Sequence, residues 1–381
     1  GDAVVLVDRL GVCVSNGGGD FGGERGGGTS GTGGNIDVTF DGNVATTPSG
    51  SNGGFGAEIA NDRGNIGTGG NISLTIGGNL TCNSLFVYTS NRNGGQIGTG
   101  GNIAFDVAGD VTTAAQAYFA VLNNGGTIGS NVVVDIHAGS FSIAHNLFAG
   151  IDNSNNGSGG GTIGGNAAID VSAANITANS IFARIDNSNG GTISNNAALL
   201  TSIGGNVTSG PFTADIINNL GSIATSATVD FHATGSVTVT GAAFWDIYSP
   251  NGSIGSDAIL NVSAASVLAF GDLVFGITND SGSIGGNAAA ALNTTGSVDS
   301  SSGNFFLDIS NNGGSIGQDA PVDFHAAGLS TGTLDTGISN NAGIITGNAV
   351  VNDQIPGDVV ATGDAFFETI NNGGTIGSNA T

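Results

Sequence analysis

Aspartates recur at equivalent positions in neighbouring copies of a repeat, and they are the residues best placed for chemistry. Asp135 and Asp170 form one such pair, and Asp152 and Asp186 form another. If the copies stack as β-strands, the members of a pair lie about 5 Å apart, which suits a retaining glycosidase or a Ca²⁺ ion. Stacked like charges are unfavourable unless water or a cation separates them. The pattern favours hydrated surface aspartates, leaves Ca²⁺ binding as an alternative, and assigns no catalytic or cofactor-binding residue.

Histidine is the second residue type that could serve a site. His137, His232 and His325 occupy the same place in the phrases VDIHAG, VDFHATG and VDFHAAG, in every third repeat. Strand stacking would separate successive members by about 14 Å, whereas the ligands of one zinc ion lie about 2 Å from the metal. These three side chains therefore cannot share a metal, and we expect them on a solvent-facing strand surface.

One arginine stands alone in the second half of the chain. Arg184 is the only Lys or Arg residue after Arg92, and the next repeat places Asp215 at the equivalent position. We expect an ion pair between Arg184 and Asp215, worth about 0–1 kcal/mol when exposed.

Composition limits the partners and the fold class. The 381 residues include 29 acidic and 5 basic residues, for a net charge of −24. Nucleic acids and anionic membranes bind basic patches, so neither is an expected partner, and no apolar run is long enough for a membrane-spanning helix. Gly accounts for 71 residues and hydrophobic residues for 39%, and this combination indicates a repetitive β structure rather than a disordered chain.

A repeat of about 31 residues organises the chain. Each copy contains an isoleucine, here called the anchor isoleucine, and a glycine two residues before it; the isoleucines are spaced by 29 to 35 residues, with a mean of 31. A turn with positive φ or a close approach of two backbone segments would explain the constant glycine. The pairs are Gly64 and Ile66, Gly95 and Ile97, Gly126 and Ile128, Gly161 and Ile163, Gly191 and Ile193, Gly221 and Ile223, Gly252 and Ile254, Gly282 and Ile284, Gly314 and Ile316, Gly343 and Ile345, and Gly374 and Ile376.

Apolar and polar residues alternate after each anchor isoleucine, as in residues 134–137, which predicts a strand with one buried face. Two further apolar stretches follow, and the last carries an aromatic residue three positions before an isoleucine, as in Phe148 and Ile151. Three short strands per repeat predict an all-β fold, a right-handed parallel β-helix of about 11 coils over residues 31–381. Residues 1–30 form a Gly-rich, β-prone segment that caps the solenoid or contacts another subunit.

Asparagines cluster just before the constant glycine, as at Asn123 and Asn124 and at Asn371 and Asn372. Asn-Gly sequences favour turns. We therefore expect a corner at this point of every coil, with each asparagine amide bonding to the copies above and below it.

The stretch GGTIGGNAAIDVSAANITANSIFARIDNSNGGTI (residues 160–193) resembles the repeats of large secreted bacterial parallel β-helix proteins of the adhesin and autotransporter-passenger kind. The resemblance covers residues 31–381 and concerns the style of the repeat. It implies an extracellular or bacterial cell-surface location and a structural or adhesive role. We therefore expect a non-enzymatic protein that contacts surface glycans; the alternatives are a carbohydrate-active β-helix enzyme and a binding module for glycans or Ca²⁺.

The two ends of the sequence lack the features that would close a solenoid. GGTIGSNAT (residues 373–381) enters a new coil without a cap, and the apolar DAVVLVD (residues 2–8) has no counterpart in the repeat. The sequence is either a piece of a longer array or a subunit that stacks head to tail with itself into a filament. Cys13 and Cys82 form either a disulfide or two free buried thiols.

Overall fold

The structure is a computed structural model, and it describes residues 5–7, 10–16, 29–30, 34–46, 54–154 and 160–381. Parallel strands stack as a β-solenoid of about 10 turns with roughly 31 residues per turn, which confirms the predicted all-β class. The described residues contain no helix, and so none that is long and apolar enough to cross a membrane.

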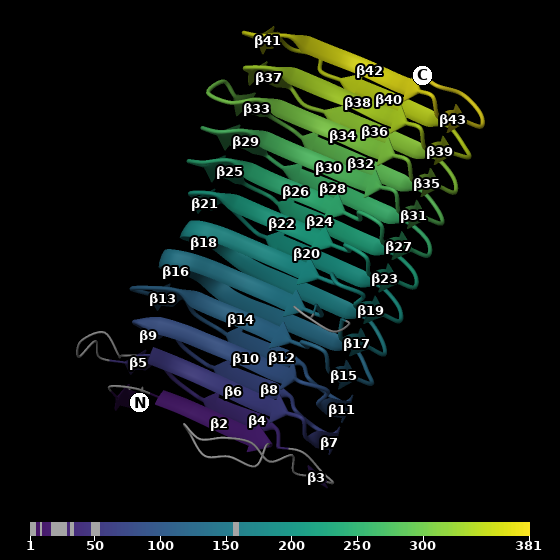
Figure 1. Cartoon of the computed structure of the whole chain (residues 1–381). Helices are drawn as coiled ribbons and strands as arrows, with labels where there is room; N and C mark the ends of the chain where they lie inside the picture. Colours follow the sequence, from purple (N-terminus) through teal and green to yellow (C-terminus); the bar gives the residue numbers. More distant parts are fainter. Residues whose placement is uncertain (1–4, 8–9, 17–28, 31–33, 47–53, 155–159) are drawn as a thin grey trace. The chain divides into compact units, whose positions relative to one another are not determined.

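The chain forms two compact units, Gly1–Ser194 and Asn195–Thr381, which share one plan. Each full coil contains a first, a second and a third strand, followed by a corner strand of two to four residues. Equivalent strands of successive coils pair in parallel, as Figure 1 shows within each unit. Side chains facing the inside of the coil form the core, and those facing outward form columns on the surface.

In the N-terminal unit, two long strands run through all three walls of their coils, and the other coils divide them into separate strands. The first strands are β4 (Ile36–Phe40), β8 (Ile72–Ile76), β12 (Ile103–Val107) and the starts of β16 (Val132–Asp152) and β18 (Ala167–Asp186). The second strands are β1 (Val5–Val7), β5 (Val44–Thr46), β9 (Leu80–Cys82) and β13 (Val111–Thr113). The third strands are β2 (Leu10–Asn16), β6 (Gly54–Asp62), β10 (Ser84–Arg92) and β14 (Ala117–Leu122). The corner strands are β3 (Thr29–Ser30), β7 (Asn65–Thr68), β11 (Gln96–Thr99), β15 (Thr127–Ile128), β17 (Thr162–Ile163) and β19 (Thr192–Ile193).

In the C-terminal unit every coil has four separate strands. The first strands are β20 (Ala197–Ile203), β24 (Ala227–Ala233), β28 (Ala258–Ala264), β32 (Ala288–Thr294), β36 (Ala320–His325) and β40 (Ala349–Gln354). The second strands are β21 (Val207–Ser209), β25 (Ser236–Val239), β29 (Ser266–Ala269), β33 (Ser297–Ser300), β37 (Gly328–Thr331) and β41 (Val359–Ala361). The third strands are β22 (Phe212–Ile217), β26 (Ala243–Tyr248), β30 (Leu273–Asp280), β34 (Phe305–Asn312), β38 (Leu334–Asn341) and β42 (Ala365–Asn372). The corner strands are β23 (Ser222–Ile223), β27 (Ser253–Ile254), β31 (Ser283–Ile284), β35 (Ser315–Ile316), β39 (Ile344–Ile345) and β43 (Thr375–Ile376).

Part of the expected N-terminal segment joins the stack. Strand β1 pairs with β5 and strand β2 pairs with β6, both in parallel. Strand β3 at residues 29–30 pairs with β7, and the remaining residues of 1–30, like the side chain of Cys13, lie outside the described residues.

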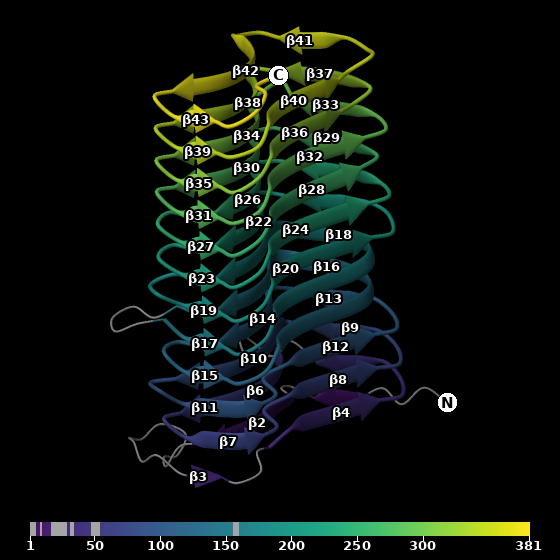
Figure 2. The same cartoon turned by 90° about the vertical axis from the view of Figure 1, so that its right-hand side faces the viewer.

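The anchor isoleucines form a buried column in each unit. Ile128, Ile163 and Ile193 pair in register along the corner strands and are fully buried. The same register continues through the corner strands of the C-terminal unit, β23 to β43, which Figure 2 shows one above another. The prediction that a period near 31 residues brings like side chains over one another is confirmed.

The aromatic residues of the third strand lie on both faces. Phe148 and Phe306, each three positions before an inward isoleucine, lie outward because an odd separation along a strand reverses the face. The core aromatics come from neighbouring positions instead, such as Trp245, whose ring stacks on that of Phe275 at a centroid distance of 4.8 Å.

A column of buried asparagines at the end of the third strand holds successive coils together. In the N-terminal unit, Asn91 Nδ2 donates to Asn123 Oδ1 at 2.7 Å, and Asn123 Nδ2 donates to Asn153 Oδ1 at 2.7 Å. Four of these amides also donate to the carbonyl that precedes an anchor isoleucine, as Asn123 does to Thr162 at 3.0 Å. The column is therefore a hydrogen-bonded ladder that ties each third strand to the corner of the next coil, as the sequence predicts. Its members in this unit are Asn61, Asn91, Asn123, Asn153 and Asn187.

The constant glycine faces this ladder at close range. A Cβ atom at Gly126 would lie 2.8 Å from Asn123 Oδ1 and closer still to Asn91 Nδ2. Of the two explanations offered by the sequence, close approach is therefore the one that holds. Positive φ belongs to the preceding residue, which is Gly125 (φ 69°) in this coil but Leu220 (φ 58°) and Ala342 (φ 54°) in others.

The ladder of the C-terminal unit is interrupted at one coil. Asn218 Nδ2 donates to Ser249 Oγ at 3.2 Å, because serine stands where the other coils have asparagine. The shorter serine side chain makes no hydrogen bond to the next member, and Asn279 Oδ1 is buried without a hydrogen-bond partner. Beyond this gap the ladder resumes from Asn279 to Asn311 and Asn340, at 2.8 Å for each step. A buried, unbonded carbonyl oxygen lowers the stability of this unit.

We predict that Ser249→Asn stabilises the protein by about 1 kcal/mol, because its amide would reach Asn279 Oδ1 and complete the ladder. The free energy of unfolding from denaturant titration measures the effect. Asn311→Ser is the matched control, since it opens a second gap in the same ladder and should destabilise. A Ser249→Asn protein no more stable than the wild type would contradict the role assigned to the ladder.

Candidate functional site

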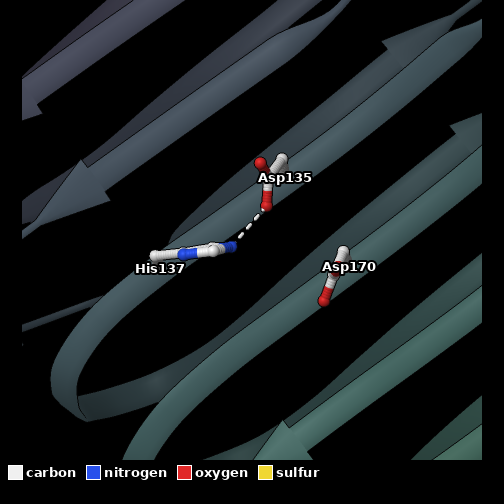
Figure 3. A group of neighbouring side chains, drawn as sticks. All are labelled: Asp135, His137 and Asp170. Atoms are coloured by element: carbon white, nitrogen blue, oxygen red, sulfur yellow. Dashed lines mark ion pairs between the residues drawn. The ribbon is translucent and has the colours of Figure 1, made fainter.

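Two adjacent coils of the N-terminal unit bring three ionisable side chains together. Asp135 and His137 are two residues apart on β16, so both point outward from the same face of the strand. Asp170 on β18 pairs in register with Asp135 and lies beside it on the next coil. Figure 3 shows the three side chains projecting from the two neighbouring strands.

The distances within this group, here called the Asp–His–Asp cluster, are short. His137 Nε2 lies 2.6 Å from Asp135 Oδ1, and the side chains of the two residues are 48% and 43% exposed. Each of the three residues offers one ligand atom, and these atoms all lie within 4.8 Å of one another. In the part of the chain that the structure describes, this is the one group of three or more His, Cys, Asp or Glu residues with such spacing.

The ion pair in the cluster is not an aligned hydrogen bond. Asp135 Oδ1 is buried and has no hydrogen-bond partner, although His137 Nε2 is close to it. Burial raises the pKa of Asp170 above its ordinary value, the neighbouring Asp135 carboxylate raises it further, and His137 lowers it. Negative charge is therefore crowded at this point, and a cation placed between the three side chains would relieve it.

The cluster combines a member of the aspartate pairs with a histidine, which were considered separately in the sequence. The expected Asp135–Asp170 pair is present, and His137 lies on the outer surface as predicted, but its membership of the same group was missed. The signal was available, because alternate residues of a strand share a face and Asp135 and His137 are two apart.

The other two Asp–x–His sequences, in VDFHATG and VDFHAAG, face a different residue on the next coil. Asp230 faces Asn261 on the next coil, and His232 faces Ser263, whose Oγ lies 2.7 Å from His232 Nδ1.

In the last copy the aspartate is held by an amide. Asn352 Nδ2 donates to Asp323 Oδ1 at 3.0 Å, beside His325 on the same strand. An aspartate at the position of Asp170 therefore distinguishes the first copy from both others.

The second predicted aspartate pair has local partners. Asp152 and Asp186 are in register, but Asp152 Oδ1 accepts from the Ser154 backbone N–H at 2.9 Å and hydroxyl at 2.6 Å, and Asp186 Oδ1 accepts from Ser188 N at 3.0 Å. These carboxylates close turns, so they are weaker Ca²⁺ candidates than the first pair. Arg184 and Asp215 belong to different units, and their ion pair stays a prediction.

The sequence placed Asp215 in a column on the third strands, but the buried carboxyl groups further along this column were not predicted. Asp215, Asp246, Gly276 and Asp308 pair in that order on successive coils. A Cβ atom at Gly276 would lie 3.4 Å from Asp246 Oδ1 and 3.5 Å from Asp308 Oδ1. The two carboxyl groups therefore face one gap, which exists because residue 276 has no side chain.

These carboxyl groups hold protons more tightly than exposed ones. Asp246 Oδ1 is buried and has no hydrogen-bond partner. Burial, and then the negative charges of Asp215 and Asp308, raise the pKa of Asp246 to about 8. Burial, and then Asp335, raise the pKa of Asp308 to about 6. At neutral pH Asp246 is therefore mostly protonated and Asp308 mostly ionised.

Two other features, a surface depression and a buried cysteine, offer no reactive group near neutral pH. An open depression in the N-terminal unit is lined by Asn35, Thr68, Asn71, Thr99, Asn102 and Ser130, none of which titrates near neutral pH. Cys82 is a buried free thiol, and burial raises its pKa to about 12. A thiol that stays protonated is a poor nucleophile.

No protein-family model matches the chain, and the searches of curated proteins and of solved structures returned no match.

We predict that stability falls as pH rises from 5 to 9. Because the pKa of Asp246 is about 8 in the folded protein against 3.8 ordinarily, the folded state binds the extra proton, and the stability that this proton contributes is lost as pH passes through 8. Asp246→Asn should remove most of the fall, on the order of 3 kcal/mol after allowance for solvent screening. Unfolding free energies across this pH range measure it.

The exposed Asp230→Asn provides the control for that experiment, since it removes a carboxylate from the same unit without changing a buried group. Equal pH dependence in the wild type and in Asp246→Asn would show that this carboxyl group is ionised and hydrated in the folded protein.

Proposed function

We propose that this chain is a non-enzymatic structural protein of a bacterial surface or the extracellular space, with an adhesive outer face. The observation that carries the proposal is the alignment of like residues into columns, both inside the coils and outside. Asn123 and Ile128 belong to columns that serve only the stacking of coils. A sequence that repeats its corner so strictly is selected for a long, uniform surface rather than for one pocket.

The outer face supplies the contacts for adhesion. Phe86, Tyr118, Phe148 and Phe182 occupy one outward column of the N-terminal unit, and the rings of Tyr118 and Phe148 stack at 4.8 Å. Partly exposed aromatic rings beside polar columns offer both apolar contact and hydrogen bonds, as sugars require. The net charge of −24 favours neutral surface glycans over anionic partners such as nucleic acids and anionic membranes.

Self-association through coil edges is the second part of the proposal. Among the described strands, β41 and β42 pair along one side only, with β37 and β38. Phe367 lies in the column of Thr336, which is fully buried, and yet it is 50% exposed. Val359 is 42% exposed, although its column neighbour Leu329 is buried. A further coil would bury these inward side chains, and we propose that it comes either from a second copy of the chain or from a continuation of the same repeat.

We predict that the chain associates in a concentration-dependent way and that Phe367→Asp weakens this association at least tenfold, because a charge would enter the buried column. Sedimentation velocity over a range of concentrations measures the association, and electron micrographs show whether filaments form.

Phe366→Asp is the matched control. Phe366 is 42% exposed on the same strand but in the outward column of Asp335, so this change should leave association intact. A wild-type chain that stays monomeric at every concentration, or equal weakening in both variants, would overturn the assembly proposal.

A carbohydrate-active enzyme is the second candidate, and the carboxyl pair at Gly276 favours it. A protonated Asp246 beside an ionised Asp308 provides the acid and the base that glycoside hydrolysis needs. Under the structural proposal we predict no turnover of plant or bacterial polysaccharides, measured as released reducing ends. Turnover that disappears in both Asp246→Asn and Asp308→Asn would replace the structural proposal with the enzymatic one.

A further inference from the structure

We infer that the Asp–His–Asp cluster binds one divalent transition-metal ion of the Zn²⁺ type, held by Asp135, His137 and Asp170. This inference goes beyond the structural role proposed above and does not depend on it.

The spacing of the ligand atoms permits a shared ion. Zinc lies about 2.0–2.2 Å from imidazole nitrogen and carboxylate oxygen, and the three ligand atoms are already within 4.8 Å of one another. His137 and Asp135 are about half exposed, so small rotations of their side chains can bring all three atoms to bonding distance. The strands themselves fix the positions, because Asp135 and Asp170 are paired in register.

The contact between His137 and Asp135 is closer than two ligands of one tetrahedral ion would be, because zinc bonds of about 2.0–2.2 Å hold their ligand atoms about 3.3 Å apart. Their closest atoms are 2.6 Å apart, but Asp135 Oδ1 makes no aligned hydrogen bond and is buried. Asp135 Oδ1 therefore lacks a hydrogen-bond partner, and a metal ion that moved the two side chains slightly apart would bond both this oxygen and the imidazole nitrogen.

The donor set selects the class of metal. One imidazole and two carboxylates suit zinc and neighbouring transition metals, whereas Ca²⁺ prefers six to eight oxygen ligands and Mg²⁺ an octahedron of oxygens. The aspartate pair alone suggested Ca²⁺. Because His137 adds a nitrogen ligand, the structure favours a transition metal instead. Three protein ligands would leave one position of a tetrahedral ion for water.

Local charge also favours an ion at this site. Asp135 and Asp170 are adjacent like charges, which destabilise paired strands unless they are bridged. Asp106 lies opposite His137 on the preceding coil and adds a further negative charge nearby. Two carboxylates and a neutral imidazole balance the charge of a divalent ion.

The chain contains its own comparison for this site. The Asp230–His232 and Asp323–His325 pairs face Asn261 and Asn352 in place of an aspartate. Asparagine offers a neutral oxygen and removes one negative charge, so both of these copies lack the third ionic ligand.

The test is metal titration of the chelator-treated, full 381-residue chain with Zn²⁺ and Co²⁺. Calorimetry gives the stoichiometry, and the visible absorption of Co²⁺ reports nitrogen and oxygen coordination of low symmetry. We expect one ion per chain, with affinity reduced at least about tenfold in His137→Ala and Asp170→Asn and unchanged in His232→Ala. An increase to two ions in Asn261→Asp would support the same assignment at the second copy.

Three results would overturn the inference. They are no binding of either metal by the wild type, equal binding by the wild type and His137→Ala, and displacement of the metal by equimolar Ca²⁺. Far-UV circular dichroism of each variant shows whether the coils remain folded, and Asp170→Asn is the most conservative change, since the other copies already carry asparagine at this place.

Discussion

The buried asparagine ladder is the interaction on which the remaining structure depends. An amide in the core costs stability unless both its ends are bonded, and Asn123 is bonded because Asn91 and Asn153 lie directly below and above it. This requirement fixes the register of successive coils, since a shift by one residue would move the amide to the other face of the strand. The corner glycine follows from the same requirement, because the backbone must pass close to the amide. Coil spacing can therefore vary from 29 to 35 residues in sequence only if the extra residues leave the ladder in place.

Register explains the chemistry of the surface as well. Once the ladder aligns the coils, every outward residue faces the residue at the same position in the next coil. Columns of equal charge then arise wherever the repeat conserves an aspartate, as at Asp135 and Asp170. Three features of the solenoid reduce this repulsion. Asparagine replaces the second aspartate beside Asp230 and Asp323, and hydroxyl or backbone groups of serine donate to Asp152 and Asp186. Burial keeps Asp246 protonated.

The fold could be predicted from the sequence because it is periodic. The anchor isoleucines, the alternation in the first strand and the asparagine corner could be read from spacing alone, and the structure places each of them as expected. Spacing places Asp246 in the column of Arg184 and Asp215 but does not reveal how deeply an outward side chain sits, so the burial of Asp246 was not predicted. Spacing did show that Asp135 and His137 share a face, but only the coordinates show how closely the two side chains approach. The reason for the constant glycine also needed coordinates, since two explanations predict the same residue.

The turn before each corner glycine has a wider consequence. The residue directly before the glycine adopts positive φ whether it is Gly125, Asn251, Ser281 or Leu220, and Leu220 is 59% exposed. The constant glycine and the variable residue before it are thus adjacent in sequence. The glycine is required by the buried ladder, whereas the residue before it is exposed to solvent. Mutation can diversify the exterior of each coil step by step while the scaffold stays constant, so a duplicated coil is able to acquire a new surface property without passing through an unfolded ancestor.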